Sequence, residues 1–287
     1  MLKNLLHLKR DFQPHWVGDG FPVRSLLSYH GDTAAIDPFL LLDYASPYEF
    51  NPGTAPRGVG EHPHRGFETV TVVYQGELEH RDSGGNAGKI GPGDVQWMTA
   101  ASGVVHQEFH SEEFTQRGGM FEVAQLWVNL PAKFKMTPPR YQEILNRDIP
   151  NASLVGGAGN VRVIAGEFAG THGPAKTYTP ILLWDLQLAA GHKTELAVPD
   201  GFTTILVVQH GVVKLGNSQP ADGVALAMFD RTGDRISIEC VRDARALLMA
   251  GKPIGEAVIG QGPFVMNTRE EIRQAAIDYQ SGAMGSL

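Results

Sequence analysis

Two short segments in the first half of the chain concentrate side chains that bind transition metals. One segment holds His62 and His64, and the other holds His106 and Glu108. Residues two apart on a β-strand project from the same face, so each pair would present its two side chains together. On facing strands the pairs would offer three imidazoles and one carboxylate. That set suits iron, nickel, copper, zinc or manganese, and it is poor for magnesium or calcium.

The order and spacing of the two pairs make this set more specific than either pair alone. The second pair begins 44 residues after the first histidine, across a Gly-Pro-Gly-Asp turn at residues 91–94. A competing interpretation places both pairs on solvated strand faces, where they would bind nothing. The spacing favours a metal site instead, because the interior of a barrel offers the concave, dry environment that such a site needs.

The elements that must position these residues are predicted to be strands. The 34 glycines and 18 prolines are spread along the chain and separate short runs of valine, isoleucine, threonine and aromatic residues. This punctuation is typical of an antiparallel barrel or sandwich, so the predicted fold class is all-β. The clearest runs span residues 68–74, 95–99, 124–130, 161–165, 181–188, 203–208 and 246–249. The one clear helix is predicted at residues 267–279, where Thr268 and Glu271 form a capping box.

One segment of the first half is repeated in the second half. Residues 67–76 can be laid over residues 202–211, both of which pair an apolar run with a closing glycine. The same offset places Ala197 and Pro199 at the positions of the first two histidines. The repeat predicts two β-barrels, of which only the first has the metal ligands.

The predicted boundary between the barrels follows a proline-rich stretch. Residues 131–140 contain three prolines and interrupt any regular strand. We therefore expect a metal-binding barrel at residues 1–138. A second barrel, without ligands and carrying the terminal helix, is expected at residues 139–287.

Composition excludes several classes of function. The formal net charge of −7 and the lack of a basic run argue against direct binding of nucleic acid. The single cysteine, Cys240, cannot form an internal disulfide. The sequence shows neither a signal peptide nor an apolar stretch of membrane-spanning length, so we expect no membrane association and a cytoplasmic location.

Several long motifs resemble those of the pirin family, whose members are bicupins with two cupin-type β-barrels. The resemblance runs from about residue 20 to the terminal helix. By this resemblance the metal of the first barrel is Fe(II), with Ni, Mn, Cu or Zn as other choices, and its ligands are His62, His64, His106 and Glu108. The motifs lie at residues 37–43, 62–70, 93–100, 103–108, 125–130 and 262–271.

The family resemblance also implies an activity, because several pirins open flavonols such as quercetin with O2. The metal would bind the 3-hydroxyl and 4-carbonyl of the substrate, and Glu108 or Glu68 would take the hydroxyl proton. The alternative is a regulatory cofactor that binds a protein partner according to the redox state of its metal. A third interpretation is a metal-dependent isomerase or a sugar-binding cupin.

The remaining candidates are weighed by their position relative to the two pairs. Glu68 is expected beside the pocket and outside the ligand set, because Glu108 already supplies a carboxylate. His110 shares a strand face with Glu108 by parity and is expected outside the ligand set. Ala101 and Phe109 depart from the pirin pattern, and we expect both to affect the shape of the substrate slot. Histidines without a partner at ligand spacing are expected to be structural or exposed; these are His80, His172, His192 and His210.

Overall fold

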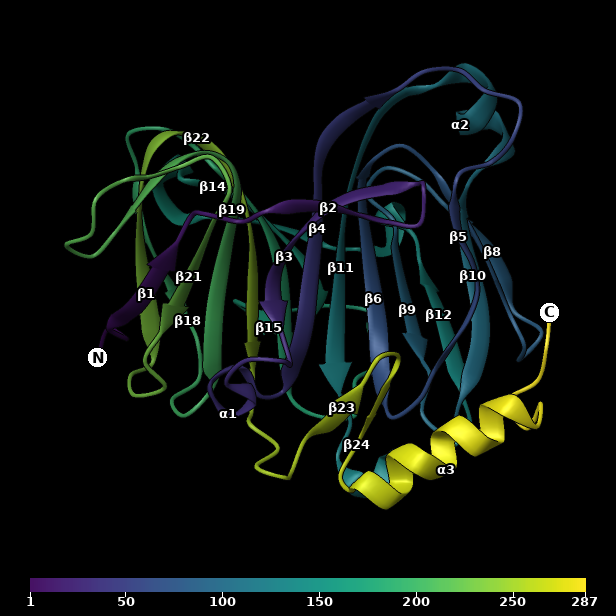
Figure 1. Cartoon of the computed structure of the whole chain (residues 1–287). Coiled ribbons are helices and arrows are strands. Elements are labelled where there is room, and N and C mark those ends of the chain that lie inside the picture. The colour runs from purple at the N-terminus through teal and green to yellow at the C-terminus, as the bar shows by residue number, and fades with distance from the viewer. The chain divides into compact units, whose positions relative to one another are not determined.

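Strands form most of the regular structure of the chain, and a computed structural model describes all residues 1–287 (Figure 1). The apolar runs predicted at 95–99 and 181–188 are strands with those bounds. The other five predicted runs also fall within strands, apart from the last residue of one run. The all-β prediction is therefore confirmed. None of the helices has an apolar stretch long enough to cross a membrane.

The chain divides into two compact units whose members are not contiguous in sequence. The N-terminal barrel consists of residues 12–146 and 254–287, and the C-terminal barrel consists of residues 1–11 and 147–253. The predicted boundary at 138/139 lies at 146/147 in the structure. The segments at the two ends of the chain each belong to the other barrel than predicted. The first strand pairs within the C-terminal barrel, and the terminal helix belongs to the N-terminal barrel. Neither assignment could be predicted from local sequence, because both depend on contacts between segments far apart in the chain.

The N-terminal barrel is built from two antiparallel sheets. Its seven-stranded sheet has the order β12 (Arg140–Ile144), β9 (Val95–Thr99), β6 (Phe67–Gln75), β11 (Gly119–Asn129), β4 (Phe39–Phe50), β3 (Phe21–Ser28) and β2 (Pro14–Val17). Its four-stranded sheet has the order β5 (Gly58–His64), β10 (Val104–His110), β7 (Leu78–Asp82) and β8 (Ala87–Ile90). Short helices α1 (Thr33–Ile36) and α2 (Glu112–Arg117) complete this part of the unit.

A core of large apolar side chains fills part of the space between these two sheets. Phe21 and Phe121 from the larger sheet pack with Leu78 and Ile90 from the smaller one, and Phe114 of α2 joins them. All five are at most 6% exposed. Their burial fixes the two sheets against each other, which in turn fixes where β5 and β10 of one sheet stand relative to the other.

The C-terminal barrel contains a single nine-stranded sheet. Its main path runs β1 (Leu5–Lys9), β21 (Ala225–Phe229), β19 (Thr203–Leu215), β22 (Arg235–Gly251), β17 (Ile181–Leu188), β14 (Gly159–Ala165) and β13 (Asn151–Ser153). Strand β18 (Lys193–Ala197) pairs with β22, and β20 (Ala221–Asp222) pairs with β19. A two-stranded hairpin, β15 (Glu167–Phe168) and β16 (Thr171–His172), lies apart from this sheet.

The repeated segments occupy equivalent places in the two barrels. Strand β6 lies between β9 and β11, and β19 lies between β21 and β22. Gly76 and Gly211, which the offset aligns, have nearly equal backbone φ angles of 86° and 84°. Only glycine adopts such angles readily, so the backbone bends at the same aligned position in both copies, directly after β6 in one and within β19 in the other. The structure supports the duplication predicted from sequence.

The terminal segment of the chain adds a hairpin and a helix to the N-terminal barrel. Strands β23 (Ile259–Gln261) and β24 (Phe264–Met266) precede α3 (Arg269–Gln280), which is yellow in Figure 1. The predicted capping box at Thr268 and Glu271 is present. Ile272 and Ala275 pack against Val105 of β10, so the helix buttresses a strand that carries two candidate ligands.

A buried lysine ties the hairpin to the turn after His64. The Lys135 ammonium donates hydrogen bonds to the carbonyls of Gly66 and Val265 and to Asn129 Oδ1, at 2.6–2.9 Å. Burial lowers the pKa of Lys135 to about 7. The three acceptors use all three donors of the side chain, which accounts for a lysine that is only 1% exposed.

Candidate metal centre

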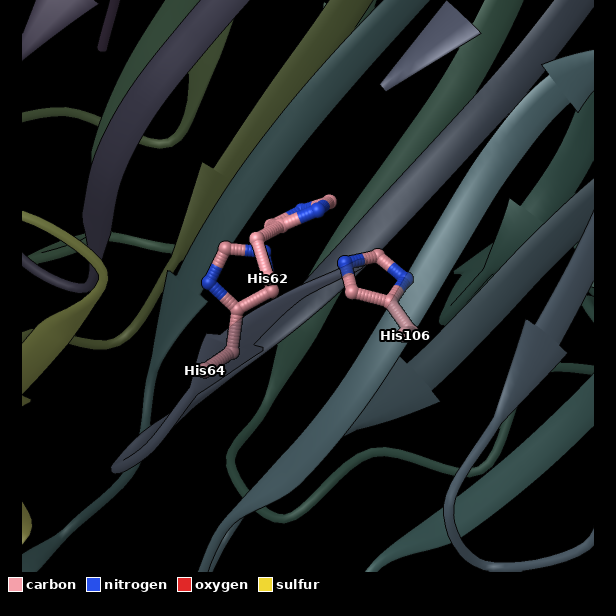
Figure 2. A group of neighbouring side chains, drawn as sticks. All are labelled: His62, His64 and His106. Carbon is pink, nitrogen blue, oxygen red and sulfur yellow. The ribbon is translucent and has the colours of Figure 1, made fainter. Parts of the chain in front are cut away.

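Three imidazoles meet at the junction of β5 and β10. His62 and His64 lie on β5, and His106 lies on β10, where it pairs with His62 in the strand register. The ring centroids of His62 and His106 are 4.2 Å apart, and those of His64 and His106 are 4.8 Å apart. One ligand nitrogen from each ring lies within 4.8 Å of the other two. Figure 2 shows the three rings facing a common space, as the strand parity of the sequence predicts.

The hydrogen bonds of the three rings leave one nitrogen of each available. His62 Nδ1 is 2.8 Å from the Gly60 carbonyl, which leaves its Nε2 free. His64 is hydrogen-bonded to the Pro263 carbonyl, and its Nδ1 is buried without a partner. His106 Nε2 is likewise buried without a partner. Buried polar atoms are almost always satisfied, so two bare nitrogens in one cluster fit a site that accepts a cation.

The protonation state of the two buried rings also fits a metal. Burial, reinforced by the neighbouring histidines, holds the pKa values of His64 and His106 well below the usual histidine range. Both rings are therefore neutral at physiological pH and keep the lone pair that coordinates a metal.

Glu108 stands beside these rings and is held by a row of polar side chains on the larger sheet. Its Oε2 accepts a hydrogen bond of 2.9 Å from Gln125 Nε2, and its Oε1 is 3.5 Å from the side chains of Thr71 and Gln96. These residues face one another across adjacent strands, and the row continues through Asp43 to Ser25. The row was not found from sequence, because its members come from five strands and share no local spacing.

A cavity of about 410 Å³ opens at this cluster, within the volume range of about 300–1,000 Å³ typical of ligand pockets. Its walls are mostly apolar, and its polar side chains gather at the metal candidates. The lining residues are Val17, Phe21, Val23, Asp43, Val59, His62, His64, Glu108, Val123, Gln125, Trp127 and Pro263. The arrangement therefore combines a candidate cation site with a cavity of the size and polarity that a small aromatic molecule requires.

Glu68 is buried on the other face of its strand. Thr71 points toward Glu108, and Glu68, three residues earlier, therefore projects from the opposite face of β6. The Glu68 Oε1 accepts a hydrogen bond of 2.8 Å from Thr99 and lies 3.9 Å from Arg140. Glu68 does not line the cavity. This corrects the prediction that Glu68 stands beside the pocket, where it could take a proton from the substrate.

The buried carboxyl of Glu68 should instead make stability depend on pH. Burial raises its pKa from 4.5 to about 7. The folded state therefore disfavours the charged form, and the free energy of unfolding should fall as pH rises from 4.5 to 7. The Glu68→Gln variant lacks this titration. Relative to the wild type it should gain on the order of 3 kcal/mol between pH 5 and pH 8, measured by denaturant unfolding at both values. A difference that does not change with pH would contradict this origin of the shift.

His80 was expected to be structural or exposed, and the structure places it next to the candidate ligands His106 and Glu108. It is 2% exposed, and one of its ring nitrogens lies within 4.8 Å of ligand atoms of His106 and Glu108. Its strand, β7, pairs with β10 so that His80 faces Glu108 and Asp82 faces His106. The alternation His80-Arg81-Asp82 was the available signal, because both side chains must project from one face.

The two departures from the pirin pattern lie away from the cavity. Phe109 follows Glu108 directly on β10, so its side chain projects from the opposite face of the strand. There it lines a separate surface pocket. Ala101 has a backbone φ of 43° in the turn between β9 and β10. A glycine there would avoid the strain of that angle. Neither residue lines the cavity, so the prediction that they shape the substrate slot is wrong.

His110 and Arg65 have structural contacts instead of places in the cluster. His110 Nε2 is 2.9 Å from the Gly20 carbonyl, and its ring packs among the aromatic core residues. Potential metal ligands form two groups, one of His62, His64 and His106 and a second of His80, His106 and Glu108, and His110 lies outside both, as predicted. Arg65 forms a 2.7 Å ion pair with Asp278 of α3.

Comparison with known proteins identifies relatives across the whole chain. The family model described as Pirin matches residues 20–128, and the model of the Pirin C-terminal cupin domain matches residues 183–285. A Pseudomonas aeruginosa protein, whose name provisionally describes a quercetin 2,3-dioxygenase, is 52% identical over 98% of both chains. A pirin-like protein of Solanum lycopersicum is 40% identical over 93% of this chain and 88% of its own.

A solved structure shows the same architecture. The crystal structure of a quercetin 2,3-dioxygenase from Acinetobacter baumannii is 49% identical and superposes with a TM-score of 0.97, covering 100% of this chain and 99% of the other. Both barrels are therefore matched by family models, and the full chain is matched by relatives. These findings confirm the resemblance read from the motifs: the chain belongs to the pirin family, with a bicupin fold.

Proposed function

We propose that the chain is a metal-dependent dioxygenase that opens flavonol-like aromatic rings with O2. Its metal would be held by His62, His64, His106 and Glu108. The observation that carries the proposal is the cluster of His62, His64 and His106. It lies at a cavity of about 410 Å³ with mostly apolar walls, which Glu108 also lines. The names of the Pseudomonas and Acinetobacter relatives support the same reaction class.

The donor set favours a borderline transition metal. Three nitrogens and one carboxylate suit Fe(II), our first choice, and also Ni, Mn, Cu or Zn. When bound, such a metal would supply Lewis acidity toward the hydroxyl and carbonyl oxygens of a flavonol and so lower the pKa of the hydroxyl. Loss of that proton to a carboxylate of the cavity would make the ring more electron-rich.

The side chains around the cavity would position the substrate and exclude water. Trp127 lies 4.2 Å from the Phe67 ring in a stacked arrangement, which gives the cavity a flat aromatic wall. Val59 and Val123 contribute apolar surface nearby. A planar ring system would replace water against this surface, and its polar edge would point toward the histidines.

Two carboxylates line the cavity and can accept the substrate's hydroxyl proton. Glu108 accepts a hydrogen bond from Gln125, and Asp43 accepts one of 2.5 Å from the Ser25 hydroxyl. Burial raises the pKa of Asp43 and so makes it a stronger base than an exposed aspartate. Asp43 replaces Glu68 as the second carboxylate considered for this role, because it faces the cavity.

Oxygen uptake after controlled metal loading tests the proposed function. The protein would be stripped of metal, reconstituted anaerobically with Fe(II), Ni, Mn, Cu or Zn in parallel, and mixed with quercetin and O2. We expect at least one loaded form to consume O2 and to bleach the long-wavelength absorption of quercetin. If every loaded form is inactive with flavonols, the alternative of a metal-containing regulatory cofactor that binds a protein partner becomes the better hypothesis.

A further inference from the structure

We infer that Asp82 and His80 form a positioning relay that fixes the tautomer of His106. The inference rests on the metal site of the proposed function and assigns a role to two residues outside its ligand set. Asp82 would hold His80 in one tautomer, and His80 would hold His106 so that its bare nitrogen faces the metal.

The relay is a continuous chain of short contacts between buried groups. Asp82 Oδ2 lies 3.1 Å from His80 Nε2, and His80 Nδ1 lies 3.4 Å from His106 Nδ1. Gln96 Nε2 also approaches His80 Nδ1, at 3.2 Å. Each of these four residues is at most 5% exposed, so water does not compete for these contacts.

The partners determine where each proton lies. A carboxylate only accepts, so His80 Nε2 carries the hydrogen that is donated to Asp82. In the neutral ring His80 Nδ1 then has no hydrogen, and its single lone pair is shared between the Gln96 amide and the N–H of His106 Nδ1. His106 therefore carries its hydrogen on Nδ1, and its Nε2 keeps a lone pair. That Nε2 is the buried atom without a partner beside His62 and His64.

Asp82 cannot rotate to serve the relay differently, because its other oxygen is already committed. Asp82 Oδ1 accepts hydrogen bonds from the backbone N–H groups of Gly84 and Asn86, at 2.9 and 3.0 Å. An asparagine at position 82 would have to keep its oxygen there. Its amide nitrogen would then face His80 and donate to it, which reverses the tautomers of His80 and His106.

Metal affinity of the purified full-length protein provides the test, with Co(II) as the probe. The variants are His80→Phe, which keeps an aromatic ring but removes both ring nitrogens, and Asp82→Asn, which is nearly isosteric. We expect each variant to raise the dissociation constant for Co(II) by about 10- to 100-fold, as losses of outer hydrogen-bond partners do. Saturated protein should still hold one Co(II) per chain, with a shifted visible absorption spectrum. His80→Gln restores an acceptor for His106 and should recover part of the affinity.

Two matched variants separate the relay from loss of packing. Asn86→Ala removes a side chain that contacts both Asp82 oxygens and leaves the contact between Asp82 and His80 in place. His110→Phe replaces another buried histidine of β10 that lies outside the relay. Both should bind Co(II) as the wild type does, even if their melting temperatures fall.

The possible results distinguish failure of the relay from failure of the site. Wild-type affinity in folded His80→Phe and Asp82→Asn would overturn the relay and leave the metal centre standing. A His80→Phe variant that binds no metal at saturation would also overturn it, because His80 would then be a ligand itself, as the second group of potential ligands allows. A wild-type protein that takes up no metal would overturn both proposals.

Discussion

Replacing His62 and His106 together by alanine should leave the purified protein almost free of metal. The wild type is expected to hold one transition metal per chain, in the N-terminal barrel. The double variant removes two of the three imidazoles that face one another, and a divalent transition metal is not retained by one imidazole and one carboxylate at micromolar concentrations. We expect elemental analysis to find less than about a tenth of the wild-type metal, a larger loss than removal of an outer partner causes.

Matched histidine variants make the metal analysis specific. His110→Ala removes a buried histidine of the same strand as His106. His192→Ala removes a partly exposed histidine from the C-terminal barrel. Neither should change the metal content per folded chain. Two metals per wild-type chain, or full retention by the double variant, would refute the assigned ligands. Circular dichroism of each variant would confirm that the comparison is made between folded proteins.

The sequence predicted the two pairs of candidate ligands because each pair is local. His62 and His64 need only strand periodicity to project together, and the same holds for His106 and Glu108. That β5 and β10 are neighbours could be expected from the spacing of the motifs. The match of the repeated segments to β6 and β19 followed from ten positions with the same apolar pattern. These features depend on short stretches of chain, which a single sequence describes well.

The features missed from sequence depend on pairing between distant strands. Asp43 reaches the cavity because its strand register places it opposite Gln125, 82 residues later in the chain. His80 is central because β7 pairs with β10. Glu68 was misplaced for a related reason. Its even spacing from His62 and His64 would place all three side chains on one face of a continuous strand, but a turn at Gly66 separates β5 from β6 and resets the parity of the side chains.

Glu108→Gln should abolish oxygen consumption with flavonols more completely than it removes metal. The carboxylate has two oxygens, so Oε2 can accept the hydrogen bond from Gln125 while the other oxygen would remain available to a metal. The amide has one oxygen and must give up one of these contacts. It also cannot take up a proton, and it leaves the site one charge more positive. We expect turnover to fall by about 100- to 10,000-fold, with metal content reduced less than in the double histidine variant.

Comparison with Asp43→Asn and Glu68→Gln would show which carboxylate accepts the substrate proton. Asp43 faces the cavity and is hydrogen-bonded to Ser25, so its amide variant should keep its metal. If Asp43 is the proton acceptor, Asp43→Asn should lose turnover at full metal content, and Glu108→Gln should owe its loss to weaker metal binding alone. Glu68→Gln should change neither quantity, because Glu68 projects from the opposite face of β6. A Glu68→Gln variant that loses its metal, while Glu108→Gln retains it, would show that the carboxylate ligand has been assigned to the wrong strand.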